Sequence, residues 1–415
     1  MMDFLAYVKE AHSAAHTLRN TQNALRSAIL MEFADALQNH SEEILSANKR
    51  DYEQAKTNGM SSPLLDRLLL TDKRIIAMAE GVREIAALPD PLHKVLEERT
   101  LSSGVHLTKI AVPIGTIGII YEARPNVTAD CAALCLKSGN ACVLKGGKEA
   151  YHSSLAIVSL IKTILQNHDM NPALVTLLPK ISHEETQRFM ECREYLDLLI
   201  PRGSRRLIRS VVDNARVPVI ETGAGICHVY VEKSADFNMA KRIIINAKCQ
   251  RPSVCNAMET LLIEKDIADT FVPFISSCMQ QQGVMMYGDE TATSLSNLIQ
   301  PVRKDSYDTE YGDLIMNIHV VNSTEEAISH IEMHGTHHSD AIISEDIKEV
   351  EKFMNGVDSA CVYHNASTRF TDGYVFGLGG EIGISTQKLH ARGPMGIREL
   401  TTYTYHLEGK GEIRE

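Results

Sequence analysis

The pattern that most constrains the fold of this chain is a regular alternation of short apolar runs with amphipathic segments. Between residues 112 and 223 the runs are nearly continuous in apolar residues, and the segments that separate them have helical periodicity. Strands that are apolar on both faces are typical of a parallel sheet covered by helices on each side. We expect strands at 117–121, 141–144, 175–178, 196–200 and 217–220, and helices at 127–136, 150–166, 182–192 and 204–214.

A second alternating series follows the glycine turn Gly223-Ala224-Gly225, whereas the first ninety residues have helical spacing throughout. A chain of 415 residues is long enough for two or three domains. The sequence therefore predicts an α/β protein with two parallel-sheet domains, whose ligands bind at the carboxyl ends of the strands. In the second series we expect strands at 228–231, 260–263, 315–321, 341–343 and 360–363, and a helix at 235–247.

Residues 98–111 break the alternation with the pattern of a β-hairpin around Ser102-Ser103-Gly104, and a strand-like run occupies 401–405. A lone two-stranded hairpin is marginally stable in water, and edge strands are usually covered or paired. A surface loop is the alternative reading of the hairpin. We predict that both segments form an arm that joins subunits, which would make the protein a homodimer or a higher even-numbered oligomer.

The charge balance argues against nucleic acid as a partner, because 42 Lys and Arg against 53 Asp and Glu leave a net charge of −11. No apolar stretch is long enough to span a bilayer, and the first residues lack the basic region and cleavage site of a signal peptide. Nine cysteines in such a chain indicate reduced thiols. We therefore expect a cytoplasmic protein that binds neither nucleic acid nor a membrane.

Two common phosphate-binding motifs are absent from the sequence. Cys142 and Glu149 break the Walker A pattern around Gly147-Lys148, and His228 stands where the dinucleotide fingerprint beginning at Gly223 needs its third glycine. One group of histidines lacks an obvious third ligand, so we expect no metal there and favour a structural or substrate-binding role for it: His330, His334, His337 and His338.

Cys255 differs from the other cysteines because it lies on a predicted loop beside basic residues. Lys248 and Arg251 precede it, and Pro252 interrupts the helix expected at 235–247. Neighbouring cations lower the pKa of a thiol, and loops on rigid scaffolds often carry reactive groups. The local sequence leaves two interpretations open for Cys255, a nucleophile or a packed thiol.

Several stretches resemble the aldehyde dehydrogenase superfamily. Its Pro-x-Asn turn, helix, Gly-Asn pair and strand ending in Leu-Lys are matched by YEARPNVTADCAALCLKSGNACVLKGGKEA at 121–150. Its order continues with PRGSRRLI at 201–208, ETGAG at 221–225 and QRPSVC at 250–255. Two further stretches resemble the γ-glutamyl phosphate reductase family within that superfamily, AISHIEMHGTHHSDAI at 327–342 and LHARGPMGIRELTTYTY at 389–405, so the likeness covers nearly the whole chain.

The resemblance implies an aldehyde-dehydrogenase-like fold and a reaction. That family, also called glutamate-5-semialdehyde dehydrogenase, reduces L-glutamate 5-phosphate with NADPH to L-glutamate 5-semialdehyde and phosphate, through a cysteine thioester, in proline biosynthesis. No kinase half is present, so a separate glutamate 5-kinase is implied as a transient partner. The implied domains are a dinucleotide-binding domain at 1–97 and 112–223, a catalytic domain at 224–385 and an oligomerisation arm at 98–111 and 386–415.

The resemblance also assigns catalytic roles. Cys255 would be the nucleophile, and the side-chain amide of Asn126 with the backbone N–H of Cys255 would stabilise the oxygen of the tetrahedral intermediate. Glu221 matches the superfamily glutamate that activates water, but a reduction needs no water. A proton relay, a contact to the nicotinamide amide and a structural role at the glycine turn stay open for Glu221.

The cofactor is expected to be NADP(H). Lys145 ends its strand where the superfamily places a lysine on the adenosine ribose, and Lys148 replaces a glutamate that often accepts the ribose hydroxyls. An ammonium attracts a 2′-phosphate, which a carboxylate would repel. The helix beginning at Ser204 would receive the pyrophosphate. The residues expected at the cofactor are Lys145, Gly146, Gly147, Lys148, Gly203, Ser204, Glu221, Thr222 and Gly223.

Recognition of the substrate needs a cation for the phosphate or the α-carboxylate and an anion for the α-amine. Arg124 and Arg251 flank the two catalytic motifs and are the first candidates for the cation, with Glu122 for the amine. The alternative enzyme is another acylating aldehyde dehydrogenase that uses a CoA thioester or a free aldehyde. A nucleic-acid-binding protein on an enzyme fold is disfavoured by the charge and by the lack of tryptophan.

Overall fold

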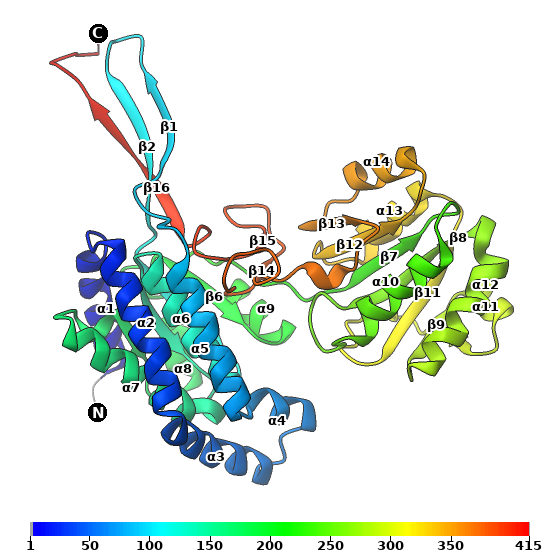
Figure 1. The fold of residues 1–415 in the computed structure, drawn as a ribbon, viewed down its shortest axis with the longest axis horizontal. Helices are drawn as coiled ribbons and strands as arrows, with labels where there is room; N and C mark the ends of the chain where they lie inside the picture. Colours follow the sequence, from blue (N-terminus) through cyan, green and yellow to red (C-terminus); the bar gives the residue numbers. More distant parts are fainter. Residues whose placement is uncertain (1–2, 415) are drawn as a thin grey trace. The chain divides into compact units, whose positions relative to one another are not determined.

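The computed structural model describes residues 3–414 and divides the chain into two compact units (Figure 1). Unit 1 contains the residues up to Thr222, Gly377–Gly383 and the residues from Met395 onward. Unit 2 contains Gly223–Phe376 and Ile384–Pro394. Each unit has a parallel sheet of its own, so the chain has the α/β architecture that the strand pattern predicts.

The last part of the chain divides differently from the expected domain bounds. Residues 377–383 belong to unit 1, where Ile382 N donates to Met395 O (3.0 Å). Residues 386–394, expected in the arm, belong to unit 2, where β14 (Ile384–Ser385) pairs with β15 (Gly393–Pro394). Antiparallel pairing of short segments that lie far from any predicted strand produces both differences.

The first ninety residues are helical, as their apolar spacing predicts. Asp3 caps the first helix by accepting from Leu5 N, and Thr71 caps the fifth by accepting from Arg74 N, which satisfies donors that a helix start leaves unpaired. The helices are α1 (Phe4–Leu18), α2 (Asn23–Asn39), α3 (Ser41–Thr57), α4 (Ser62–Leu68) and α5 (Asp72–Ala87).

The sheet of unit 1 is parallel and has the strand order β5-β4-β3-β6. Ile120, Val143 and Leu199 form a buried cluster with side chains of α1, α8 and α9. The helix α6 contacts β3 and β4, and α7 contacts β5. The elements are β3 (Thr116–Tyr121), α6 (Pro125–Lys137), β4 (Ala141–Lys145), η1 (Lys148–Ala150), α7 (Tyr151–Asn167), η2 (Pro172–Leu174), β5 (Val175–Leu177), α8 (His183–Met190), β6 (Leu198–Arg202) and α9 (Arg205–Asn214).

The strand expected at 217–220 does not form, and this prediction is wrong. Val219 makes only an isolated bridge with Leu199, although Leu199 N donates to Pro218 O and Ile220 N donates to Leu199 O. Pro218 has no N–H to donate to residue 197, and Pro201 on β6 has none to donate to Ile220, so the bridge cannot extend into a ladder in either direction.

Unit 2 has a parallel sheet of seven strands within the described residues, in the order β10-β9-β11-β8-β7-β12-β13. Val229 and Val231 pack with α10 and α11, whereas Tyr230 between them packs with Phe353 on the opposite face. The sequence did not predict the two short strands β9 and β10. The elements are β7 (Cys227–Val231), α10 (Phe237–Cys249), β8 (Met258–Glu264), α11 (Lys265–Gln281), β9 (Met285–Gly288), α12 (Glu290–Leu295), β10 (Ile299–Pro301), β11 (Ile315–Val321), α13 (Thr324–His334), β12 (Ser339–Ile343), α14 (Ile347–Gly356), β13 (Cys361–His364) and η3 (Thr368–Phe370).

The predicted hairpin and the tail strand form one antiparallel sheet, β1-β2-β16, which Figure 1 draws extending beyond the helices of unit 1. Its strands are β1 (Val95–Thr100), β2 (His106–Pro113) and β16 (Thr401–Glu408). Apolar side chains on both edge strands are about half exposed, among them Val95, Leu96, Tyr403 and Leu407. We call this sheet the arm; it covers too little apolar surface to have a core of its own.

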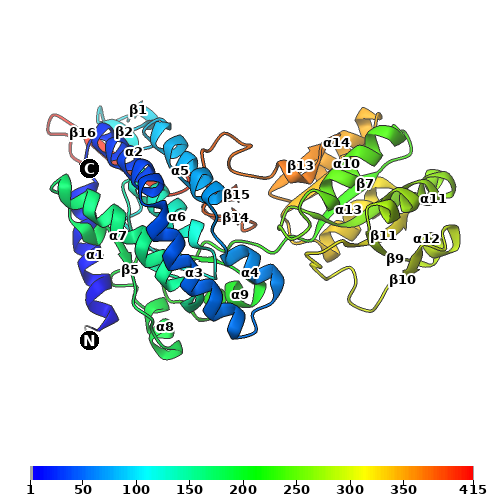
Figure 2. The same ribbon diagram turned by 60° about the horizontal axis from the view of Figure 1, so that its bottom comes forward.

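The helices of both units are packed around these sheets, as the turned view in Figure 2 also shows for each unit. Over residues 3–414, none of the helices combines the length and the apolar character that crossing a bilayer requires. All nine cysteines lie within this range as free thiols.

Candidate active site

Cys255 lies on a loop of unit 2 between the end of α10 and the start of β8, and its side chain is partly exposed. A buried thiol holds the backbone of this loop, because Cys227 Sγ donates a weak hydrogen bond to Cys255 O at 3.2 Å. Burial raises the pKa of the Cys227 thiol well above its usual value. Cys227 is therefore a packing partner, and Cys255 is the thiol of this pair that a reagent can reach.

Gly225 is in unusually close contact with the cysteine loop. A Cβ added to Gly225 would lie 1.4 Å from Cys255 O, so only glycine fits beside this backbone. Gly225 N donates to Glu310 Oε1 at 3.1 Å, which holds the glycine turn from its other side. The glycine motif that the sequence placed before Cys255 therefore positions the cysteine backbone directly.

Asn256, next to the cysteine, fastens the loop to a distant segment of unit 2. Its buried side-chain amide Nδ2 donates to Thr371 O (2.8 Å), and its backbone carbonyl oxygen accepts from Thr368 Oγ1 (2.7 Å). Arg369 lies in the same segment and donates to Asn256 Oδ1. The sequence reasoning missed both Asn256 and Arg369, because 113 residues separate them along the chain and neither belongs to a recognised motif.

In unit 1, three predicted binding segments, two for the cofactor and one for the substrate, begin at the carboxyl ends of neighbouring parallel strands. Lys145 ends β4, Glu122 follows β3, and Gly203 follows β6. Since β3 pairs with both β4 and β6 in register, the three segments leave the same edge of one sheet. This edge is where open α/β sheets bind ligands.

The lysines and glycines after β4 form a cramped, positively charged turn. Burial lowers the pKa of Lys145, although Glu149 opposes that shift, and Lys148 is exposed. A Cβ at Gly146 would lie 3.1 Å from the ring of Tyr121, so the backbone passes close to that ring. Two ammonium groups beside a glycine turn are donors that suit phosphate groups.

The N-terminus of α9, expected to receive pyrophosphate, holds a carboxylate of the chain itself. Glu122 accepts from Ser204 N (2.8 Å) and from Ser204 Oγ (2.6 Å). A Cβ at Gly203 would lie 2.8 Å from that carboxylate. Glu122 thus engages two donors of the N-cap residue Ser204, next to the helix N–H groups that a bound anion would use. The amine-binding role of Glu122 and the pyrophosphate role of Ser204 both stay predictions.

Asn126 lies in the first turn of α6 with an exposed side chain, and Arg124 stands at the N-cap position of that helix without a side-chain capping bond. Asn126 Nδ2 donates to Asp130 Oδ2 at 3.3 Å, one turn further along the helix. Burial raises the pKa of Asp130 to about 7, while the Asn126 amide and the charge of Arg202 act in the opposite direction. An amide has two N–H donors, so this bond orients the group and leaves the second donor for a ligand.

The remaining expected residues belong partly to unit 1 and partly to unit 2. Thr222 is buried and donates through Oγ1 to Pro201 O (2.7 Å), and Glu221 before it is partly exposed. Gly223 belongs to unit 2, where a Cβ would lie 2.5 Å from the side chain of Thr386. Arg251 is exposed four residues before the cysteine.

The predicted histidine group separates into two places in unit 2. The rings of His330 and His334 lie at the end of α13 with centroids 4.6 Å apart and planes tilted by 48°, and His319 stacks on His330 at 4.7 Å. Burial, and then the neighbouring histidines, lower the pKa of His330 to about 2. His338 is buried, and its Nδ1 lies 2.8 Å from Ser339 Oγ. These contacts favour the structural role.

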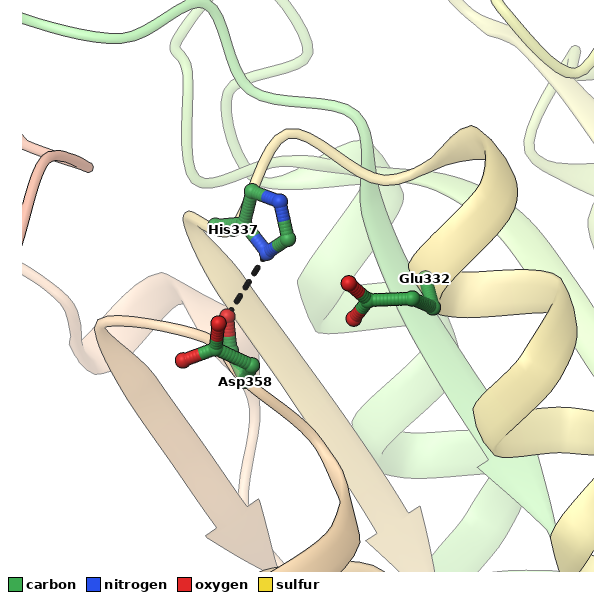
Figure 3. Close-up of side chains that lie close together, drawn as sticks. All are labelled: Glu332, His337 and Asp358. Atoms are coloured by element: carbon green, nitrogen blue, oxygen red, sulfur yellow. Dashed lines mark hydrogen bonds between the residues drawn. The ribbon is translucent and has the colours of Figure 1, made fainter.

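One set of side chains in residues 3–414 has ligand-type atoms within 4.8 Å of one another, Glu332, His337 and Asp358 (Figure 3). His337 Nδ1 donates to the backbone oxygen of Asp358 at 2.7 Å, so Nε2 is the nitrogen of the neutral ring that carries no proton. The Asp358 carboxylate pairs with Lys388 and with Arg392 (2.9 Å). Hydrogen bonds and ion pairs within the chain therefore engage His337 and Asp358.

Comparison with known proteins identifies the class to which this arrangement belongs. A family model described as "Aldehyde dehydrogenase family" matches residues 2–311, about three quarters of the sequence. The chain belongs to the aldehyde dehydrogenase family.

Within that family, similar proteins with a particular name match this chain from end to end. A gamma-glutamyl phosphate reductase of Carboxydothermus hydrogenoformans is 48% identical over 414 residues and covers 100% of both chains. One of Streptococcus suis is 50% identical over 404 residues, or 97% of each chain. The crystal structure of gamma-glutamyl phosphate reductase from Thermotoga maritima has a TM-score of 0.97 at 43% identity and covers 100% of both chains.

Proposed function

We propose that this protein reduces L-glutamate 5-phosphate to L-glutamate 5-semialdehyde and phosphate, with NADPH as the reductant, in proline biosynthesis. The observation that carries the proposal is the end-to-end match at 48–50% identity to relatives named for this activity. A reachable thiol held by the backbone contact of Gly225 and Cys255 supplies the chemistry that the activity needs.

The proposed reaction has two covalent steps at Cys255. The thiolate attacks the acyl carbon, a carbon–sulfur bond forms, and phosphate departs with the electron pair of the broken carbon–oxygen bond. When bound, the reduced nicotinamide supplies the hydride that converts the thioester carbon to a hemithioacetal. The carbon–sulfur bond then breaks, the aldehyde forms and the thiolate returns.

Asn126 is proposed as a donor to the oxygen that becomes negative in each tetrahedral intermediate, together with the backbone N–H of Cys255. The bond from Asn126 to Asp130 supports this role because it fixes the amide plane before the substrate binds. Glu221 is proposed as a proton relay, since the reductive direction gives it no water to activate.

We propose that the nicotinamide cofactor is NADP(H) and that the strand ends of unit 1 hold it. Lys145 and Lys148 supply positive charge. Gly146 and Gly147 have no side chains, so a ligand can approach the backbone of the turn closely. The preference for the phosphorylated cofactor rests on Lys148, whose exposed ammonium would meet a 2′-phosphate.

An assay in the reverse direction tests the function. NADP⁺ reduction should require both glutamate 5-semialdehyde and phosphate, and arsenate should replace phosphate whereas CoA should not. A companion assay with glutamate 5-kinase, ATP and glutamate should oxidise NADPH. Activity with a CoA thioester and none in the kinase-coupled assay would instead establish the other acylating class.

We further propose a cytoplasmic enzyme that forms a homodimer or a higher even-numbered oligomer and that takes its labile substrate from glutamate 5-kinase. The nine free thiols support a reducing compartment. The arm supports oligomerisation, because its two edge strands carry half-exposed apolar side chains that a neighbouring subunit could cover.

A further inference from the structure

Arg369 is a half-buried cation in η3 that the loop of the nucleophile holds in place. Its Nε donates to Gln250 Oε1 at 3.0 Å, and its Nη1 donates to Asn256 Oδ1. Gln250 and Asn256 stand on either side of Cys255 in the sequence. A guanidinium has five N–H donors, so these two bonds orient it without exhausting it.

The support beneath Arg369 is rigid. Asn256, Thr368 and Thr371 are almost completely buried, and their hydrogen bonds tie η3 to the residue after the nucleophile. Thr371 Oγ1 lies 2.6 Å from the hydroxyl of Ser339 on β12, which extends the network into the central sheet. The guanidinium and the cysteine backbone therefore share one buried support.

The charged groups nearest Arg369 are one carboxylate, Asp372, and one further guanidinium, Arg251. Burial lowers the pKa of Arg369, and the nearby charge of Arg251 lowers it further, whereas Asp372, Cys255 and Cys227 act in the opposite direction. Asp372 offsets one of the two guanidinium charges beside the nucleophile, and a bound anion would offset the other. Arginine forks suit phosphate oxygens, to which they donate paired hydrogen bonds.

We propose that Arg369, with Arg251, binds the phosphoryl group of the acyl phosphate and receives the phosphate that Cys255 displaces. This inference rests on the proposed function. When sulfur bonds to the acyl carbon, the electron pair of the broken bond moves onto the departing phosphate oxygen, and the guanidinium donors meet that charge where it develops. The α-carboxylate is not the ligand, because it lies at the far end of the glutamyl chain from the carbon that Cys255 attacks.

The test compares Arg369→Gln and Arg369→Lys with Arg242→Gln, a matched loss of charge on the exposed face of α10. In the reverse assay, Arg369→Gln should raise the KM for phosphate roughly ten- to hundredfold, as expected for losing a charge-assisted contact. Its KM for the semialdehyde should change less than about twofold, and the control should match the wild type. Arg369→Lys should fall between them, because it keeps the charge but loses the fork.

A binding readout makes the result independent of turnover. Inorganic phosphate should slow the alkylation of Cys255 by iodoacetamide in the wild type and in Arg242→Gln, but far less in Arg369→Gln. A rise in the KM for the semialdehyde alone would assign Arg369 to the α-carboxylate and overturn the proposal. A shifted pH profile of alkylation with an unchanged KM for phosphate would overturn it too, in favour of thiolate activation.

The outcomes separate this proposal from the proposed function. A wild type that does not use phosphate at all refutes the function, and the role of Arg369 falls with it. A phosphate-dependent wild type whose KM for phosphate is unaffected by Arg369→Lys and Arg369→Gln refutes only the role of Arg369. If Arg369→Gln does not fold, the Arg369→Lys comparison and its phosphate protection decide the question alone.

Discussion

Replacing Gly225 by alanine should disable the enzyme while leaving most of the fold intact. The added Cβ would lie 1.4 Å from Cys255 O, 2.3 Å from its carbonyl carbon and 2.8 Å from its Cα. Real Cβ atoms essentially never come within 3.0 Å of such neighbours, so one backbone must retreat by about 1.6 Å. The neighbours are backbone atoms rather than a flexible side chain, so rotation about a side-chain bond cannot absorb the clash.

The cysteine loop is the part that should move. Gly225 adjoins strand β7 of the buried sheet and is bonded to Glu310, whereas Cys255 lies on a partly exposed loop. A misplacement of about 1 Å can cost on the order of a hundredfold in rate, so kcat/KM for Gly225→Ala should fall at least a hundredfold. The free energy of unfolding should fall by only roughly 1–3 kcal/mol, the usual cost of overpacking.

The assay pairs steady-state kinetics with thermal unfolding, and Gly283→Ala is the matched control. Gly283 also lies in unit 2 and has a φ of +75°, but a Cβ there would meet nothing within 4 Å. This variant should lose some stability through backbone strain and keep its activity. A folded Gly225→Ala enzyme with wild-type kcat/KM would refute the claim that this contact positions the nucleophile.

Four further predictions follow from the same structure. Cys255→Ala should abolish turnover while Cys131→Ala keeps most of it; an acyl adduct found by mass spectrometry on another cysteine, with Cys255 unmodified, would contradict the assignment. Lys148→Glu should weaken or reverse a preference for NADPH over NADH, whereas unchanged ratios of kcat/KM would remove Lys148 from the site. Deleting residues 101–107 behind a Gly-Ser bridge should shift the mass in light scattering toward the monomer, and a full-length protein already monomeric at micromolar concentration would disprove the interface. Burial holds the pKa of His330 at about 2, below its value in the unfolded chain, so unfolding takes up a proton and the free energy of unfolding falls as the pH drops below about 6.5. His330→Leu should reduce the slope of the free energy of unfolding against pH on the acid side by up to about 1.4 kcal/mol per pH unit. Identical slopes in the variant and the wild type would refute this.

Local periodicity was sufficient to predict most strands, because apolar runs bury themselves wherever helices cover a sheet. The error at 217–220 shows its limit, since Val217, Val219 and Ile220 have the composition of a strand while Pro218 lacks the N–H that a ladder needs. The short strands β9 and β10 were missed for the opposite reason. Their few apolar residues become strands only because β11 lies beside β9 to accept the pairing.

The local sequence left two interpretations open for Cys255, a nucleophile or a packed thiol, and the resemblance to the aldehyde dehydrogenase superfamily assigned it the nucleophilic role. The contacts that surround the site residues in the fold could not be predicted from the sequence. Gly225 was visible as part of a glycine turn, but its contact with Cys255 O depends on how two loops of unit 2 pack. Glu122 was expected at the substrate amine, yet the fold places its carboxylate on Ser204.

The sequence by itself determined the alternation of strands and helices, the reachable thiol and the two segments of the arm, since each depends on residues close together in the chain. Tertiary structure alone decided that β16 pairs with β2 and that Asn256 meets Arg369 across 113 residues. Periodicity records which face of an element is apolar. It does not record which distant segment supplies the partner of a buried donor or acceptor. That partner is determined only when segments far apart in the sequence pack together and their buried polar groups must form hydrogen bonds.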